Sequence, residues 1–152
     1  GKARMRGFAA IGLHCPKDGF NIGGVLRAAH CYGAASVAIS GQRITSKHIN
    51  HATNTAKAHR HIPVMRGDLR DMIPFGAVPV AVDLVDDATP LQDFYHPPAA
   101  FYIFGPEDGT LGKAILDFCP KRVMVPTAFC MNLAATVNVV LYDRLAKQLR
   151  SK

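Results

Sequence analysis

The chain has 152 residues, of which 49% are hydrophobic and 19% are charged, and this balance is typical of one soluble globular domain rather than a disordered or fibrous protein. No apolar run approaches the roughly 20 residues that span a bilayer, and the N-terminal residues lack the apolar core of a signal peptide. The net charge of +7 lies in the first half: residues 1–76 carry 11 Lys and Arg against three Asp and Glu, whereas residues 77–152 carry seven against eight. We therefore expect a single cytoplasmic domain over residues 1–152 with no membrane partner, whose basic half binds a polyanion, an inert basic surface being the alternative.

The hydrophobic patterning predicts strands that alternate with helices. Apolar runs predict strands at 8–15, 36–40, 62–65, 78–85, 100–104 and 122–125. Helices are expected at 22–32, partly within 45–60, and at 67–73, 111–118 and 132–149; Asn21 is expected to N-cap the first, and Gly33 to end it. This alternation predicts an α/β fold, a parallel sheet with helices on both faces, in which ligands bind beyond the carboxyl ends of the strands.

The cysteines and histidines form no recognisable metal motif. The four cysteines stand far apart and are expected to be free thiols; they are Cys15, Cys31, Cys119 and Cys130. The histidines at 48, 51, 59 and 61 match no zinc-ligand spacing, so we expect no metal, although four imidazoles in one segment leave metal binding as an alternative.

The beginning of the first predicted helix is the first segment that indicates chemistry. Gly23 and Gly24 occupy its first turn, where each costs up to about 1 kcal/mol relative to alanine. That cost indicates that something approaches the backbone, and the free N–H groups of a helix N-terminus suit a phosphate. Arg27 follows one to two turns later, with a guanidinium that can fork onto a phosphate or ribose oxygen. A capped core helix with one solvated arginine is the alternative.

Two loops that follow predicted strands also indicate a ligand site. The segment from Phe104 to Gly109 combines glycines and a proline, which expose backbone groups, with the carboxylate of Glu107. The segment from Val125 to Thr136 forms a loop that can grip an adenine through backbone hydrogen bonds and apolar side chains. Each segment alone is equally compatible with a plain connection.

Taken in order, these three segments resemble the three motifs of the SpoU/TrmH family, within the SPOUT class of RNA methyltransferases. The family's N-x-G-x-x-x-R motif matches Asn21 to Arg27, and its S-x-N-x-S motif matches Cys130 to Ala134. Its F-G-x-E-x-x-G motif matches Phe104 to Gly109, with Leu111 and Gly112 following. The resemblance extends from Phe8 to the last helix and is strongest to the minimal TrmL-type members.

The resemblance implies a deep C-terminal trefoil knot (the SPOUT, or α/β-knot, fold), S-adenosyl-L-methionine as the cofactor, and a homodimer whose second subunit completes the site. It implies 2′-O-ribose methylation of RNA, with tRNA and its wobble nucleotide as the expected target. The catalytic residues it implies are Asn21, Arg27, Glu107 and Asn132. The cofactor-binding residues it implies are Leu84, Phe104, Gly105, Glu107, Gly109, Val125, Pro126, Cys130, Met131 and Ala134.

Two residues depart from the family pattern, because Cys130 and Ala134 stand where the third motif has serines. A thiol donates weakly and alanine not at all, so cofactor hydrogen bonding is weaker or the substrate contact differs. These changes leave a knotted RNA-binding module without catalysis as one alternative. A separate alternative keeps the enzyme and has ribosomal RNA as the substrate.

The expected roles follow from the chemistry of each side chain. A guanidinium stays protonated at neutral pH, so we expect Arg27 to clamp the ribose hydroxyl beside an RNA phosphate, while that phosphate or water accepts the proton. Asn21 is expected to orient Arg27 or the ribose, Glu107 to anchor the motif loops or Arg27, and Asn132 to hold the third loop.

A basic surface is the expected electrostatic contact with RNA. Its members are Arg4, Arg6, Arg27, Lys47, Lys57, Arg60 and Arg66, with histidines interleaved from 48 to 61. A solvated basic face without a partner is the alternative.

Overall fold

A computed structural model describes residues 5–55 and 61–151 of the chain. Its strands form one sheet in the order β3-β2-β1-β6-β4-β7-β5, and every neighbouring pair is parallel. The strands are β1 (Phe8–Leu13), β2 (Val37–Ile39), β3 (Val64–Arg66), β4 (Val78–Val82), β5 (Thr89–Pro90), β6 (Ala99–Phe104) and β7 (Lys121–Met124). The predicted parallel sheet is confirmed.

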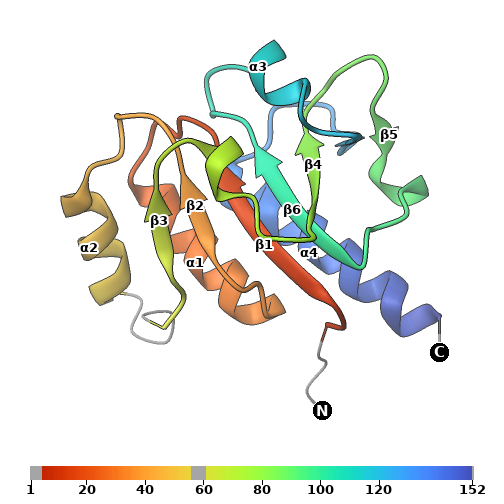
Figure 1. The fold of residues 1–152 in the computed structure, drawn as a ribbon, viewed down its shortest axis with the longest axis horizontal. Helices are drawn as coiled ribbons and strands as arrows, with labels where there is room; N and C mark the ends of the chain where they lie inside the picture. The colour runs from red at the N-terminus through yellow and green to blue at the C-terminus, as the bar shows by residue number, and fades with distance from the viewer. Residues whose placement is uncertain (1–4, 56–60, 152) are drawn as a thin grey trace.

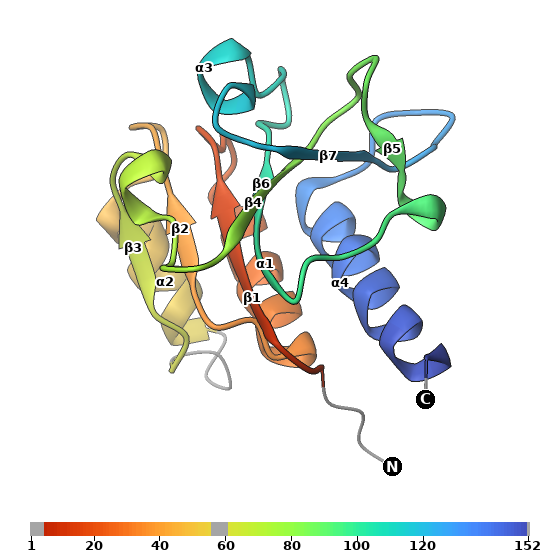
Figure 2. The same cartoon turned by 45° about the vertical axis from the view of Figure 1, so that its right-hand side comes forward.

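Helices cover both faces of this sheet, as predicted, but unequally (Figures 1 and 2). The longer helices pack on one face: α1 (Phe20–Tyr32), α2 (Ser46–Thr55) and α4 (Leu133–Arg150). The other face carries the 3₁₀-helix η2 (Leu69–Met72) and the short α3 (Lys113–Leu116). A further 3₁₀-helix, η3 (Leu91–Asp93), precedes β6.

The two central strands, β1 and β6, divide their side chains between two cores. In β1, Ile11 and Leu13 face α1 and α4, whereas Ala10 faces η2 and α3. In β6, Tyr102 joins the first core and Phe101 the second. This alternation has the two-residue period of a strand, and burial on both faces explains why the runs read as continuously apolar.

Several predicted boundaries are wrong for local reasons. The first strand ends at Leu13, because the chain turns at Cys15, which has a φ of 50°. Helix α1 begins at Phe20 with Gly19 as N-cap, and the side chain of Asn21 makes tertiary bonds instead of capping it. Gly112 has a φ of 78°, so the helix predicted at 111–118 begins only at Lys113. Gly33 ends α1 in the left-handed conformation, as predicted.

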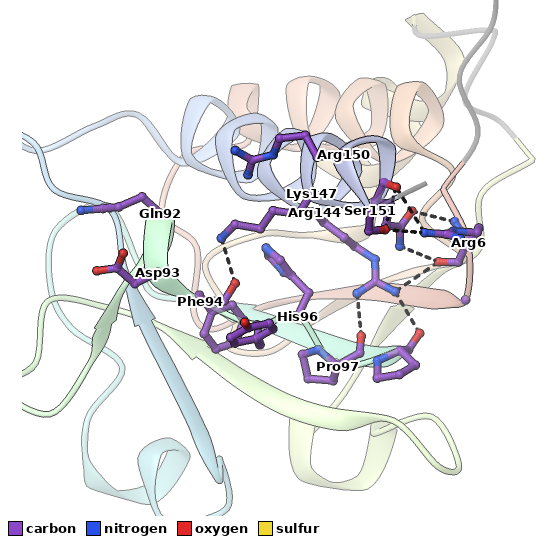
Figure 3. A pocket seen from close by; sticks show the side chains of 14 residues that line it. Arg6, Gln92, Asp93, Phe94, His96, Pro97, Arg144, Lys147, Arg150 and Ser151 are labelled. Carbon is purple, nitrogen blue, oxygen red and sulfur yellow. Dashed lines mark hydrogen bonds between the residues drawn. The ribbon is translucent and has the colours of Figure 1, made fainter.

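Arg144 fastens the last turns of α4 to the beginnings of β1 and β6 (Figure 3). Its side chain is buried, and Nη1 donates to the carbonyl of Pro97 at 2.7 Å and to the hydroxyl of Tyr102 at 2.9 Å. Nη2 donates to the carbonyl of Pro98 at 2.9 Å, and to those of Arg6 and Phe8 at longer distances. Backbone dipoles thus solvate a buried cation, which makes the contact specific to arginine.

A hollow of about 810 Å³ lies beside this arginine, at the opposite end of α4 from the predicted ligand loops (Figure 3). Its cations hold the fold together: Lys147 donates to the carbonyls of Leu91 and Phe94 and pairs with Asp143 at 2.8 Å. Since the residues of α4 that line it begin at Arg144 and the helix rises about 1.5 Å per residue, this hollow begins roughly 17 Å from the helix N-terminus. We therefore assign it a structural role.

His96 is buried next to Arg144 with both ring nitrogens bonded. The carboxylate of Asp143 accepts from His96 Nε2 at 2.7 Å, so in the neutral ring Nδ1 is the acceptor and the hydroxyl of Tyr102 donates to it at 2.7 Å. Burial lowers the pKa of His96, and this effect outweighs the neighbouring carboxylate of Asp143, which raises it. The neutral ring is therefore the form that the folded protein favours.

We predict that the protein loses stability as the pH falls below 6.5. The unfolded chain then binds more protons than the folded one at His96, and the loss levels off below the lowered pKa. Urea unfolding at pH 7, 6 and 5 measures it, and His96→Gln should lower stability at pH 7 while flattening its pH dependence. His61→Gln, at an exposed position, is the control. If the unfolding free energy of His96→Gln changed with pH as steeply as that of the wild type, His96 would not be the source of the pH dependence.

Candidate active site

Glu107 joins the turn after β6 to the loop that leads into α1. Its Oε1 accepts the backbone N–H of Lys17 at 3.1 Å, and its Oε2 accepts the N–H of Asp18 at 3.0 Å. The amide Nδ2 of Asn21 also donates to Oε2, at 2.8 Å. One carboxylate thus holds three donors from a segment about 90 residues earlier in the chain.

Asn132 connects the third segment to the same network. Its Nδ2 donates to Oδ1 of Asn21 at 2.8 Å, while its own Oδ1 accepts the N–H of Ala135 at 3.2 Å and caps α4. The side chains of Asn21, Glu107 and Asn132 therefore form a continuous chain of hydrogen bonds. The three segments that the sequence analysis singled out lie together at the carboxyl ends of β1 and β6.

The ionisation of Glu107 reflects two opposed effects. Burial by itself would raise its pKa, but the donors from Lys17, Asn21 and Asp18 outweigh burial and lower it. The side chain is therefore a carboxylate at neutral pH, and its oxygens hold the loop that leads into α1.

A cavity of about 160 Å³ opens next to this network, at the ends of β4, β6 and β7. Eight of the predicted cofactor residues line it: Leu84, Phe104, Gly105, Glu107, Gly109, Val125, Cys130 and Met131. Its other lining residues, which the sequence analysis missed, are Val82, Asp83, Pro106, Thr127, Leu133 and Thr136. Among these residues the charged side chains are Asp83 and Glu107, both acidic, so the cavity suits a ligand that combines positive charge with apolar parts.

Asp83 sets the shape of the cavity wall. Its Oδ1 accepts the N–H of Leu84 at 2.8 Å, and its Oδ2 accepts the N–H of Leu111 at 3.0 Å. The carboxylate thus ties the end of β4 to the loop after β6. An acidic residue directly after an apolar strand was the available sequence signal for it.

Ala134 does not line the cavity, contrary to expectation, and neither does Pro126. A Cβ atom placed at Gly24 would lie 2.8 Å from the Cβ of Ala134, so α4 contacts α1 where α1 has no side chain. The group that approaches the backbone at Gly24 is therefore a second helix. Gly23 has open space above it and lines a separate hollow between α1 and α2.

The predicted RNA-contacting residues occupy different parts of the molecule. Arg27 is exposed on α1 and is absent from the cavity lining, while Lys47 on α2 and Arg66 at the end of β3 are exposed near the loop edge. Arg6 stands apart: it bonds Gln148 and Ser151 at the far end of β1, roughly 20 Å along that strand. Arg4, Lys57 and Arg60 lie outside the described residues.

Arg43 supports the site from outside and was not predicted. Its guanidinium pairs with Asp108 at 2.8 Å and donates to the carbonyl of Cys15. The hydrogen bond from Arg43 lowers the pKa of Asp108, and both side chains are 43% exposed. Such an exposed pair contributes little stability, but it orients the turn that carries Glu107.

Within residues 5–55 and 61–151, no group of three or more His, Cys, Asp or Glu side chains is placed to hold a metal ion. The four cysteines are free thiols. None of the described helices combines the length and apolar character needed to cross a bilayer.

The sequence of residues 9–142 matches the model of the SpoU rRNA Methylase family. The chain belongs to this family. The match covers most of the chain and includes all three motif segments, so the predicted family membership is confirmed. No curated protein matches the sequence.

Solved structures of SpoU proteins share the fold. The SpoU methyltransferase AviRb from Streptomyces viridochromogenes, in complex with the cofactor AdoMet, is 19% identical with a TM-score of 0.80, over 96% of this chain and 59% of that one. The TrmH/SpoU tRNA modifying enzyme of A. aeolicus is 13% identical with a TM-score of 0.82, over 98% of this chain and 79% of that one. A structure concerned with 2-OH methylation of C/U34 on tRNA is 20% identical with a TM-score of 0.76, over 96% of this chain and 99% of that one. The chain thus spans less than two thirds of AviRb but nearly all of the last protein.

We predict that the two functions of Asn132 can be separated. Asn132→Ala removes the α4 cap and the bond to Asn21, and should lower the free energy of unfolding by about 1 kcal/mol or more. Asn132→Ser keeps a capping oxygen but lacks the amide donor, so it should retain most of the stability. Urea unfolding of both variants measures the difference, and equal losses would contradict the capping role.

Proposed function

We propose that this SpoU protein is an S-adenosyl-L-methionine-dependent RNA methyltransferase that modifies the 2′-hydroxyl of a ribose in tRNA. The observation that carries the proposal is the hydrogen-bonded chain Glu107–Asn21–Asn132 at the edge of an acidic cavity. Two similar structures support tRNA as the substrate: the TrmH/SpoU tRNA modifying enzyme of A. aeolicus and the structure concerned with C/U34 methylation on tRNA. Ribosomal RNA is the second candidate, since rRNA methyltransferases are among the similar structures.

S-adenosyl-L-methionine, when bound, supplies an electrophilic methyl group on a positively charged sulfur. The residues of this chain fit such a group: Leu84, Val125 and Met131 offer apolar contact, and Asp83 and Glu107 offer negative charge. The oxygens of both carboxylates already accept N–H groups, so backbone groups of Gly105 and neighbouring residues would make the direct hydrogen bonds.

The proposed role of Arg27 is to hold the ribose hydroxyl beside an RNA phosphate, which takes up the proton. A guanidinium suits this role because it stays charged and forms two parallel hydrogen bonds. The side chain of Asn21 donates to Glu107 and accepts from Asn132, so its proposed role is to fix the first turn of α1, the helix that carries Arg27.

We further propose that the working form is a homodimer. Arg27 is exposed and does not line the cavity of its own chain, so a second copy that brings an arginine to the site would complete it. The outer faces of α1 and α4 offer apolar surface for such a contact, including Tyr142 (56% exposed), whose ring packs edge-on against Tyr32, and Val139 (37% exposed).

The deep trefoil knot is also part of the proposal. Its support is that the chain returns from β7 through residues 125–132 and packs α4 against α1, beside the loop that follows β6. The proposed location is the cytoplasm, where such an enzyme meets its RNA.

The direct test is methyl transfer by the whole chain. Calorimetric titration with S-adenosyl-L-methionine measures cofactor binding, and mass-spectrometric mapping of tRNA and ribosomal RNA after incubation identifies any methylated ribose. Methylated tRNA supports the proposal and methylated rRNA alone supports the second candidate. Cofactor-independent RNA binding without transfer would indicate a non-catalytic module instead.

We predict that Arg27→Ala leaves cofactor affinity within about twofold of wild type and slows methyl transfer at least about 100-fold. Arg27→Lys keeps the charge but loses the two-pronged geometry, so it should recover only part of the rate. Calorimetry and single-turnover transfer measure the two effects. Undiminished transfer by Arg27→Ala would end the clamp hypothesis.

We also predict that tRNA affinity falls as salt rises, in proportion to the phosphates neutralised. Arg66→Ala should reduce the slope of log affinity against log salt by about one. Lys121→Ala, at the opposite end of the sheet from the loops, is the matched control and should leave the slope unchanged. Affinity that is independent of salt would refute the electrostatic contact.

A further inference from the structure

A hollow of about 480 Å³ lies between the first turn of α1 and helix α2, which run side by side (Figure 1). It adjoins a second hollow of about 600 Å³ over the Asn21–Glu107–Asn132 network, with which it shares Asp18, Gly19 and His48. That second hollow in turn shares Glu107, Cys130 and Met131 with the cavity. The three hollows therefore form a row that leads away from the cavity toward α2.

Phe20 forms one wall of the outermost hollow, and its ring is 90% exposed. Its backbone is held in place, since its N–H donates to Asp18 Oδ1 at 2.9 Å. Asp18 before it and Asn21 after it both donate to the carboxylate of Glu107. An aromatic ring kept in water on a fixed backbone is a surface on which an unstacked base can stack. A base stacked on the ring of Phe20 would cover this exposed apolar surface.

His48 forms the opposite wall and presents a defined hydrogen-bond donor. Its Nδ1 accepts the backbone N–H of Thr45 at 3.0 Å, and a backbone N–H can only donate, so the proton of the neutral ring is on Nε2. The ring also packs against Gly19, where a Cβ atom would lie 2.9 Å from His48 Cδ2. His48 is thus positioned on both sides and offers an N–H group to an oxygen acceptor.

The rest of the hollow suits a nucleotide. Gly23 leaves its floor open, and Lys47 adds an exposed positive charge beside His51. Asp18 is the acidic side chain that faces it, and one oxygen of that carboxylate is engaged by the N–H of Phe20.

We propose that this hollow binds the base of the nucleotide whose ribose lies over the Asn21–Glu107–Asn132 network. The base stacks on Phe20, and His48 Nε2–H donates to an oxygen of the same nucleotide. This inference rests on the proposed function and adds to it that the substrate is an unpaired nucleotide turned out of its stack.

The test uses the whole chain and tRNA as the substrate. Phe20→Ala should raise the KM for tRNA about tenfold, which corresponds to the loss of one stacked base, with cofactor affinity unchanged. Phe20→Trp should restore the KM, because it restores an aromatic face. His48→Ala should raise the KM, and His48→Gln, which keeps a donor, should recover part of it. Phe75→Ala removes a fully exposed phenylalanine that lines none of the three hollows, and is the matched control.

A fluorescent base gives a direct readout. RNA with 2-aminopurine at the nucleotide mapped as methylated should be quenched by the wild type and by Phe20→Trp, but less by Phe20→Ala. Unchanged KM and quenching in Phe20→Ala, or a change in its oligomeric state by sedimentation, would overturn the inference while methylation by the wild type stands. A wild type that transfers no methyl group to RNA would remove the proposed function and this inference together.

Discussion

The carboxylate of Glu107 is the constraint on which the rest of the site depends. It accepts two backbone N–H groups and one side-chain amide from a segment about 90 residues earlier, so it fixes where α1 begins. Replacing it by an apolar residue would take a charged acceptor away from the backbone N–H groups of Lys17 and Asp18, and a hydrogen bond to a charged group contributes more than a neutral one. The positions of Asn21 and Phe20, and the contact with Asn132, all follow from this anchor.

At the other end of α4, Arg144 performs a similar task with the charges reversed, because carbonyl oxygens surround a buried cation. The helix that carries the third motif is therefore held near both ends.

The sequence predicted the sheet and the long helices because their signals are local. Apolar runs define β1 and β6, and the pattern after Asn132 defines α4 to within a residue or two. Apart from the local turns at Cys15 and Gly112, the errors lie where a contact with a distant part of the chain determines the structure. Asn21 has the composition of an N-cap, but its oxygen accepts from Asn132, 111 residues away, and its amide donates to Glu107. Strand β5 has two residues and exists only because β7 pairs with it, so no pattern in its own sequence could indicate it.

The site was predictable as a set of segments and less so as a set of side chains. Eight of the ten expected cofactor residues line the cavity. Loops that follow parallel strands lie at the carboxyl edge of the sheet, which is where such cavities form. The pair Gly23-Gly24 shows the limit of such reasoning. Both glycines have the same cost in a helix, yet Gly24 accommodates Ala134 of α4 while Gly23 opens a hollow, and only the packing distinguishes them. His48 shows the same limit: its residue type left open which ring nitrogen carries the proton, whereas the bond from Thr45 makes Nδ1 the acceptor and leaves Nε2–H as the donor.

The distribution of charge ties the cavity to the surface around it. The cavity has Asp83 and Glu107 as its charged side chains, while Lys47, Arg66 and Arg27 are exposed outside it. A cationic cofactor and a polyanionic RNA are thus attracted to different places on one small domain, and neither competes for the site of the other.

The acidic character of the cavity also affects how readily product leaves it. Under the proposed reaction, methyl transfer removes the positive charge from the sulfur of the cofactor, so the attraction of the acidic cavity weakens at the step that forms product. The acidic lining that favours binding before transfer therefore attracts the product less strongly and favours its release.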